Sequence, residues 1–108
     1  MSYNVKTISV FEKQARRLSK KFPSLKNGLQ KLVDSLKQVP AQGTAIGNNC
    51  YKIRVAITSK GKGKSGGSRV ITHVVIVDKL VYLLSIYDKS EKASLSQNEL
   101  KFLLKEII

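Results

Sequence analysis

The sequence predicts a single α+β domain, in which an N-terminal strand and a helical hairpin pack on an antiparallel β-sheet and a short helix follows. Three observations lead to this fold class. Apolar residues recur at helical spacing as far as Pro40, alternate with polar residues from Tyr51 onward, and return to helical spacing after Ser96. A chain of 108 residues suffices for one hydrophobic core. We therefore expect one domain over residues 1–108.

The first third of the chain is predicted to contain a strand and two helices. The strand is expected at residues 3–8. Ser9 and Glu12 then have the spacing of a capping box, and the helix that they begin should end at Pro23. Ser24 is the expected cap of a second helix, whose apolar stripe ends before the next proline. The two helices should form a hairpin.

The middle of the chain is predicted to be an antiparallel meander. Residues 41–49 are rich in Gly, Asn and Ala and are expected to form a loop. Strand patterns then follow at residues 51–57, 68–77 and 80–87. Asp78 and Lys79 are few enough for a tight hairpin turn between the last two strands. Ser96 and Glu99 repeat the capping-box spacing and predict the start of an amphipathic C-terminal helix.

The chain is strongly basic. Twenty Lys and Arg residues against seven Asp and Glu residues give a net charge of +13, which exceeds what solubility requires. Residues 41–77 carry six cations and no acidic residue. An ordinary solvated surface would mix the two signs, so this pattern favours a polyanionic partner.

Several protein classes are disfavoured by the composition. Cys50 and His73 are the only cysteine and the only histidine, so the sequence offers no disulfide framework and no metal-binding cluster. The N-terminus lacks the apolar stretch of a secretion signal, and no apolar run is long enough to span a membrane. We expect a cytoplasmic protein without a membrane-spanning segment or a metal site.

Four cations are predicted to gather at one end of one sheet face. Strand alternation places Lys52 and Arg54 together on the face opposite the apolar one. In the expected register Lys52 lies opposite His73, and Arg69 joins the same face. A two-residue turn in the next hairpin would place Arg69 opposite the residue before Lys89. This grouping depends on the register, because a slip of one residue turns a side chain to the other face.

A glycine-rich loop precedes Arg69 and contains Lys60, Lys62 and Lys64. These lysines lie on flexible backbone at the same end of the sheet and can reach a phosphate chain. The Gly-x-Gly-x-x-Gly spacing and a Gly-Lys-Ser triplet resemble nucleotide-binding motifs, but a β-branched strand follows them where those motifs require a helix. From the residues alone, a solvated hairpin loop fits equally well.

His73 and Tyr82 have both a structural and a functional interpretation. A lone histidine on a half-apolar strand is more often packed than catalytic, and we favour packing for His73. Tyr51 and Tyr87 are more often core or sheet-surface residues than platforms for bases. Tyr82 falls on the cationic face and is the tyrosine best placed to stack on a base. We keep His73 and Tyr82 as candidates for contact with RNA.

Three segments carry a family likeness, namely Tyr51–Arg54, Gly61–Ile71 and Leu83–Lys89. Together with the helical hairpin before them and the Leu-Ser-x-x-Glu-Leu helix after them, they resemble the RelE superfamily of toxins, particularly its HigB-type branch. The likeness spans nearly the whole chain. Its most specific part is the run Gly-Lys-Gly-Lys-Ser-Gly-Gly-x-Arg-Val-Ile.

This resemblance implies a toxin that enters the ribosomal A site, cleaves the bound messenger RNA without a metal or other cofactor, and is inhibited by an antitoxin protein. Arg69 matches the family's transition-state arginine, and Lys52 and Arg54 match its basic strand residues. Lys89 matches the basic residue after the fourth strand. Some members carry a tyrosine in the segment after the fourth strand, where this chain has Leu95 and Ser96, so the resemblance does not identify the general base.

The expected chemistry assigns different roles to these cations. RNA cleavage requires attack of a ribose 2′-hydroxyl on the adjacent phosphate, with a proton acceptor and positive charge at phosphorus. Arg69 suits the second role, since a guanidinium binds two phosphate oxygens at once and stays charged. A lysine crowded by other cations releases its proton more readily, which makes Lys52 the candidate base. Arg54 and Lys89 would then be supporting charges.

Two other functions remain open from the sequence. A ParE-like inhibitor would share the fold but bind a topoisomerase, and it would not need a cationic cluster. A non-catalytic RNA- or ribosome-binding protein would need only the basic surface. The toxin hypothesis predicts three partners: messenger RNA on the ribosome, ribosomal RNA and a cognate antitoxin.

Overall fold

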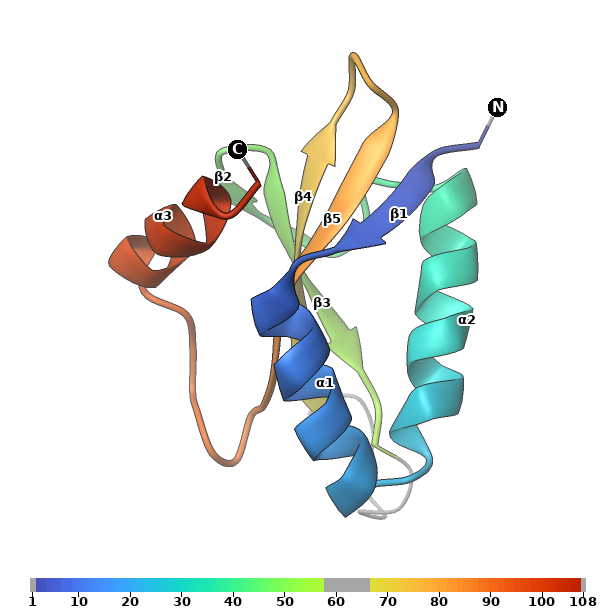
Figure 1. Cartoon of the computed structure of the whole chain (residues 1–108), viewed down its shortest axis with the longest axis vertical. Helices are drawn as coiled ribbons and strands as arrows, with labels where there is room; N and C mark the ends of the chain where they lie inside the picture. The colour runs from blue at the N-terminus through green and yellow to red at the C-terminus, as the bar shows by residue number, and fades with distance from the viewer. Residues whose placement is uncertain (1, 58–66, 108) are drawn as a thin grey trace.

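The structure is a computed structural model that describes residues 2–57 and 67–107. These residues form an α+β fold, as expected (Figure 1). In chain order the elements are β1 (Asn4–Thr7), α1 (Ser9–Lys21), α2 (Leu25–Gln38), β2 (Thr44–Gly47), β3 (Cys50–Val55), β4 (Ser68–Val75), β5 (Leu80–Asp88) and α3 (Gln97–Lys105). None of the described helices is long and apolar enough to cross a membrane.

The strands form one mixed sheet. Its five strands follow the order β1-β5-β4-β3-β2. The meander β3-β4-β5 is antiparallel, as expected, and β2 adds an antiparallel edge. At the other edge β1 pairs with β5 in parallel, and the helical hairpin then carries the chain from this edge to β2 at the opposite edge. In Figure 1 the helices α1 and α2 lie to one side of the sheet and α3 lies to the other.

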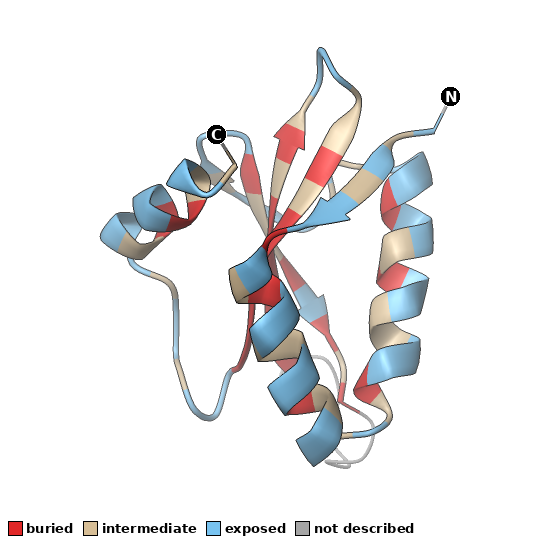
Figure 2. Ribbon diagram, viewed as in Figure 1, coloured by how far each residue is buried: buried red, intermediate tan, exposed pale blue. Residues whose placement is uncertain are grey.

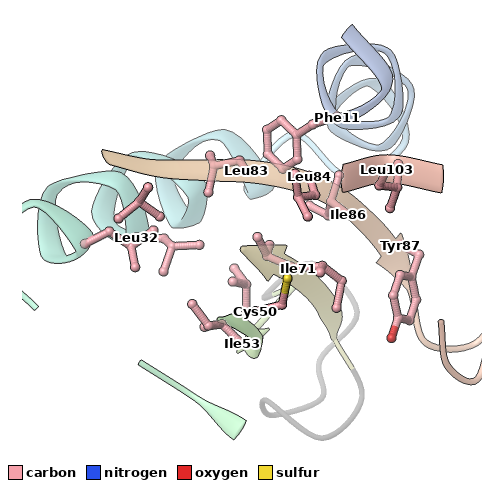
Figure 3. Packing of buried hydrophobic residues seen from close by; sticks show 14 of the residues in the cluster. Phe11, Leu32, Cys50, Ile53, Ile71, Leu83, Leu84, Ile86, Tyr87 and Leu103 are labelled. Atoms are coloured by element: carbon pink, nitrogen blue, oxygen red, sulfur yellow. The ribbon is translucent and has the colours of Figure 1, made fainter. Parts of the chain in front are cut away.

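The core lies between the sheet and the helical hairpin. Alternation along β3 buries Ile53 and Val55, and cross-strand pairing places Ile53 beside the buried Val70. Phe11 of α1 is buried in the same cluster (Figure 3), as is Leu18 of the same helix. Figure 2 shows that the buried positions of α1 and α2 alternate with exposed ones along each helix. Each large apolar side chain buried in this way contributes about 1.5–3 kcal/mol. The packing of the hairpin therefore fixes which face of the sheet remains for polar residues.

Residues 41–49 contain a strand that the sequence pattern did not predict. Thr44–Gly47 forms β2 and pairs with β3 through a tight turn at Asn48 and Asn49. Both asparagines have left-handed backbone angles, with φ of 56° and 58°. A two-residue turn of this hand matches the twist of the strands that it joins. The strand is short and largely exposed, so it lacks the apolar alternation by which strands are recognised.

The β4–β5 hairpin also differs from the prediction. β4 ends at Val75, which pairs with Leu80, so residues 76–79 connect the strands. A two-residue turn at Asp78 and Lys79 would require left-handed angles at both positions, whereas here Lys79 adopts one, with φ of 52°. The expected register is therefore wrong by two residues at the turn, and a register shift between Ile71 and Thr72 reduces the difference to one residue at Arg69.

The capping predictions have different outcomes. The capping box at Ser9 and Glu12 is wrong, because the N-cap of α1 is Ile8 and no side chain makes its capping hydrogen bond. Ser24 occupies the N-cap position of α2, but with helical backbone angles and without a capping hydrogen bond from its side chain. Both helices are held by their buried apolar stripes.

The capping box of α3 is confirmed. The Ser96 hydroxyl accepts a hydrogen bond from the Glu99 amide at 3.1 Å, and the Ser96 amide donates to the Glu99 carboxylate at 3.0 Å. Leu100 and Leu103 are buried. This helix packs beside the face of the sheet that carries the predicted cations.

Candidate active site

Two arginines lie directly opposite each other on neighbouring strands. Arg54 of β3 pairs with Arg69 of β4, so their side chains leave the same face with Cβ atoms about 4.5–5.5 Å apart. Like charges in this arrangement repel and destabilise the sheet. An anion that contacts both guanidinium groups would relieve the repulsion. The pair is therefore the centre of the candidate site.

The register that brings the arginines together differs from the expected one by two residues. Lys52 lies opposite Ile71 instead of His73, while His73 lies opposite Cys50. A shift of two residues preserves the face of every side chain, and the predicted cationic face is therefore retained. Lys52, Arg54 and Arg69 all lie on it.

Gly67 allows the close approach that sets this register. A Cβ atom at Gly67 would lie 2.4 Å from the carbonyl oxygen of Val55, which a larger residue cannot tolerate. The neighbouring Ser68 hydroxyl, which is buried, donates a hydrogen bond to the same oxygen at 3.0 Å. These contacts hold the start of β4 against the end of β3, where the arginines pair.

The two arginines differ in their environments. Arg69 is only 3% exposed, and its Nη1 donates a hydrogen bond to the Ser68 carbonyl at 3.1 Å. Arg54 is exposed. Charge interactions are stronger where water is excluded. An anion would thus meet a solvated guanidinium first and a sheltered one beneath it.

Tyr87 completes this row of the sheet, and the sequence pattern did not single it out. It pairs with Arg69 across β4 and β5, where Asp88 was expected. The side chain is 5% exposed, and its buried hydroxyl has no hydrogen-bond partner among the described residues. Burial raises the pKa of the phenol, an effect that Arg69 partly opposes. Figure 3 shows the hydroxyl oxygen directed away from Leu103.

Lys52 and Tyr87 line one small cavity. The cavity measures 90 Å³ and lies between the cationic face and the segment that leads into α3. Leu95 forms part of its wall. Two groups able to exchange protons, an amine and a phenol, thus reach the same space beside the arginine row.

Lys89 follows β5 at the same end of the sheet. Its amide donates a hydrogen bond to the Gly67 carbonyl at 3.2 Å, which holds its backbone beside a residue two positions before Arg69. The Asp88 carboxylate accepts hydrogen bonds from the Ser90 amide at 3.0 Å and the Ser90 hydroxyl at 2.9 Å. This turn directs the chain away from the sheet, and the Lys89 side chain is exposed.

An ion pair ties the segment after Lys89 to α1. The Glu91 carboxylate contacts Arg17 at 2.9 Å and Lys21 at 3.3 Å. Hydrogen bonds from these two cations lower the pKa of Glu91. The groups are solvent-exposed, so the contact contributes more to positioning than to stability.

The remaining predicted contact residues do not join the cluster. His73 pairs with Tyr82 four residues along β4 from Arg69, a distance of about 13 Å. Cys50 lies there too, with its Sγ 3.4 Å from the His73 Nδ1. The sequence candidates Lys60, Lys62 and Lys64 lie outside the described residues. Among residues 2–57 and 67–107, no three His, Cys, Asp or Glu side chains converge on a possible metal position.

The fold and this site define a class of small basic α+β proteins whose sheet presents cations to an anionic partner. Comparison with known protein families shows which family within this class the chain belongs to. A family model described as the RelE toxin of the RelE/RelB toxin-antitoxin system matches residues 7–107. The chain belongs to the RelE toxin family.

Two solved structures share the fold. One is the E. coli toxin RelE in the free state, carrying two arginine-to-alanine substitutions, with a TM-score of 0.66, 19% identity and full coverage of both chains, 100% of each. The other is the isolated E. coli RelE toxin, with a TM-score of 0.63 and 19% identity over 99% of this chain and 100% of that one. At this identity the likeness concerns the fold.

Proposed function

We propose that this protein is the toxin of a type II toxin–antitoxin system and that it cleaves messenger RNA in the ribosomal A site without a metal ion. The observation that carries the proposal is the pairing of Arg54 with Arg69, with Lys52 on the same face. Family membership supports the toxin class. The motifs around the glycine-lysine loop favour the HigB-type branch, and the site of action is the cytoplasm, where ribosomes translate.

In the proposed reaction each of the clustered side chains has a separate chemical role. The ribose 2′-oxygen attacks the adjacent phosphorus, and the bond from phosphorus to the 5′-oxygen breaks, leaving a cyclic phosphate. Arg69 binds the charge that accumulates on the phosphate oxygens, because its planar guanidinium can donate two parallel hydrogen bonds. Lys52 accepts the proton of the 2′-hydroxyl. Arg54 and Lys89 add supporting charge.

RNA contacts are also proposed beyond the scissile phosphate. His73 and Tyr82 lie farther along the same sheet face and would meet neighbouring nucleotides. The lysines at 60, 62 and 64 precede β4 and would meet phosphates at the near end.

A second cationic surface supports engagement of ribosomal RNA. Five cations line one face of α1: Lys13, Arg16, Arg17, Lys20 and Lys21. Because α1 packs against the opposite face of the sheet from Arg54, one RNA strand at the arginine pair would not also cover α1. A folded RNA that surrounds the protein offers phosphates to both surfaces. The antitoxin is proposed to be acidic and to cover the cationic sheet face.

The test is cleavage of a defined messenger bound to ribosomes, with the new RNA ends mapped. We expect the wild type to cut within the A-site codon. Arg69→Ala should lower the rate on saturating ribosomes by a factor on the order of 10² to 10³, the range for removal of one preorganised donor. Arg69→Lys should recover only part of the rate, because an ammonium lacks the bidentate fork. Arg54→Ala, at an exposed position, should also cut more slowly.

A matched control is Lys31→Ala, which removes one exposed cation from α2 and should cut at the wild-type rate. Thermal melts should confirm that each variant is folded. Ribosome binding by the wild type without any new RNA end would contradict the enzymatic proposal and favour a binding protein. Inhibition of a topoisomerase without RNA cleavage would favour the ParE-like alternative. Near-normal cutting by folded Arg69→Ala would remove Arg69 from the mechanism.

A further inference from the structure

The hydroxyls of Tyr87 and Thr72 are the two buried side-chain polar groups without a hydrogen-bond partner in the described part of the protein, and of these two residues only Tyr87 lies on the cationic face. Leaving a buried hydroxyl unpaired costs about 1–3 kcal/mol, and native proteins contain few such groups. A phenylalanine would fill the same space without this cost. The hydroxyl is therefore not explained by folding.

The position of Tyr87 relates this hydroxyl to the proposed phosphate site. The residue pairs with Arg69, which in turn pairs with Arg54, so three side chains leave the same face in one row across β3, β4 and β5. Lys52, the proposed base, lines the same 90 Å³ cavity as Tyr87. Base, phosphate-binding group and phenol thus surround one end of the sheet face.

The proposed cleavage also needs a proton donor, a role that the assignments above leave open. When the bond from phosphorus to the 5′-oxygen breaks, the electron pair stays on that oxygen, which must then gain a proton. Arginine holds its protons too tightly to supply one readily. A phenol is a suitable donor, and burial raises the pKa of Tyr87, so the hydroxyl stays protonated at neutral pH.

We infer that Tyr87 is the proton donor to the departing 5′-oxygen. This inference rests on the proposed function. As the 2′-oxygen bonds to phosphorus its proton passes to Lys52, and as the bond to the 5′-oxygen breaks the Tyr87 proton passes to that oxygen. The phenolate left behind lies beside Arg69, whose charge stabilises it, and the proton held by Lys52 then restores the phenol. No proton is gained or lost overall.

Access to the hydroxyl places one requirement on the RNA. Ser94 and Leu95, from the segment between β5 and α3, line the cavity that Tyr87 reaches. The scissile phosphate must enter past these two residues. In Figure 1 this segment arches away from the sheet before α3 begins, and it contains no helix or strand that would have to unfold.

The test compares two leaving groups on the ribosome. One messenger has the natural 5′-oxygen at the cleaved bond, and the other has sulfur in its place. A thiolate leaves without needing a proton, so the sulfur substrate makes a proton donor unnecessary. Tyr87→Phe should cut the oxygen substrate slower by a factor on the order of 10² and the sulfur substrate at the wild-type rate. Arg69→Ala should remain slow on both.

Two controls separate this role from a structural one. Tyr51→Phe removes a hydroxyl from a tyrosine on the other face of the sheet and should cut both substrates normally. Tyr87→Phe should melt at or above the wild-type temperature, because its hydroxyl makes no hydrogen bond within the described residues. A lower melting temperature would overturn the premise that the hydroxyl is unpaired.

The outcomes also separate this inference from the proposed function. If the wild type cuts neither substrate, the proposed function fails. If the wild type cuts and Tyr87→Phe cuts the oxygen substrate equally fast, the function stands and Tyr87 is not the donor. If Tyr87→Phe is equally slow on both substrates, the residue affects binding or positioning, and the assignment as a proton donor is wrong.

Discussion

Individual residues in the arginine row lower the stability of the sheet that carries them. The Arg54–Arg69 pair places like charges across two strands, an arrangement that disfavours the sheet by about 0.2–1 kcal/mol. The buried, unpaired Tyr87 hydroxyl adds a further unfavourable contribution. The stability of the fold explains neither the like-charge pair nor the unpaired hydroxyl. They are explained if an anionic ligand contacts this row.

Cys50 lies four residues before Arg54 on the same strand and shows how packing controls reactivity. Burial raises the pKa of its thiol to about 11. The ordinary value is near 8.5, so the folded protein should hold less thiolate at neutral pH by a factor on the order of 10². Labelling with iodoacetamide should therefore be at least that much slower in the folded state than in denaturant. Equal labelling rates would show that Cys50 is accessible.

The same shift predicts a pH dependence of stability. Between the ordinary thiol pKa and about 11, the unfolded chain loses the Cys50 proton while the folded protein keeps it. The unfolded state is thereby favoured, and stability falls as pH rises through this range. The unfolding free energy of Cys50→Ala should decline less over the same range, which urea titrations at a series of alkaline pH values would measure.

At the scale of the element, Gln14 connects α1 to the strand that carries Tyr87. Its Oε1 accepts hydrogen bonds from the Ser85 hydroxyl at 3.0 Å and from the Ile86 amide at 3.1 Å. The parallel pairing of β1 with β5 ends at Leu83, so β1 cannot supply a partner for this amide. A helix side chain therefore takes the place of the missing strand.

Gln14→Leu should destabilise the protein by about 1–3 kcal/mol, because two donors are left without their acceptor while the side chain keeps a similar size. The matched control is Gln30→Leu on α2. Gln30 is exposed, and its amide donates to Asp34 at 3.2 Å on the helix surface, so its replacement should change stability little. Urea denaturation of both variants measures the difference. Equal destabilisation would mean that Gln14 does not replace the strand.

At the scale of the whole molecule, cations are distributed over two opposite surfaces. One is the sheet face with Arg54 and Arg69, and the other is the exposed side of α1. On α1, Arg17 and Lys21 are joined to Glu91, whereas Lys13, Arg16 and Lys20 make no ion pair among the described residues. A net charge of +13 spread in this way suits a partner that surrounds the protein.

Replacing Lys13, Arg16 and Lys20 with glutamine should weaken ribosome binding and reduce its salt dependence. For each phosphate that the variant no longer neutralises, the slope of log affinity against log salt should fall by about 0.7–0.9. Cleavage on saturating ribosomes should be unchanged, since α1 lies away from the arginine row. The control replaces the scattered exposed residues Lys31, Lys37 and Lys101. If the slope falls equally in both triple variants, total charge matters and the α1 surface does not.

Local patterns in the sequence were sufficient for most elements and for the predicted cationic face. Helical spacing identified α1, α2 and α3, because the apolar residues that face the core recur at a fixed spacing within each amphipathic helix. Strand alternation placed Lys52 and Arg54 on one face, and that prediction survived a register shift of two residues. The capping box at Ser96 could also be predicted from the sequence, since both of its hydrogen bonds join residues three positions apart.

Only the tertiary structure decided how these elements meet. The contact of Gly67 with β3 set the arginine register, and the β4–β5 turn together with a register shift between Ile71 and Thr72 set the partner of Arg69 as Tyr87. The periodicity of apolar residues likewise did not predict the parallel pairing of β1 with β5 or the short edge strand β2. These features depend on contacts between residues far apart in the chain. Sequence spacing alone therefore determined the chemistry available on each face, while packing determined which groups of that face come together.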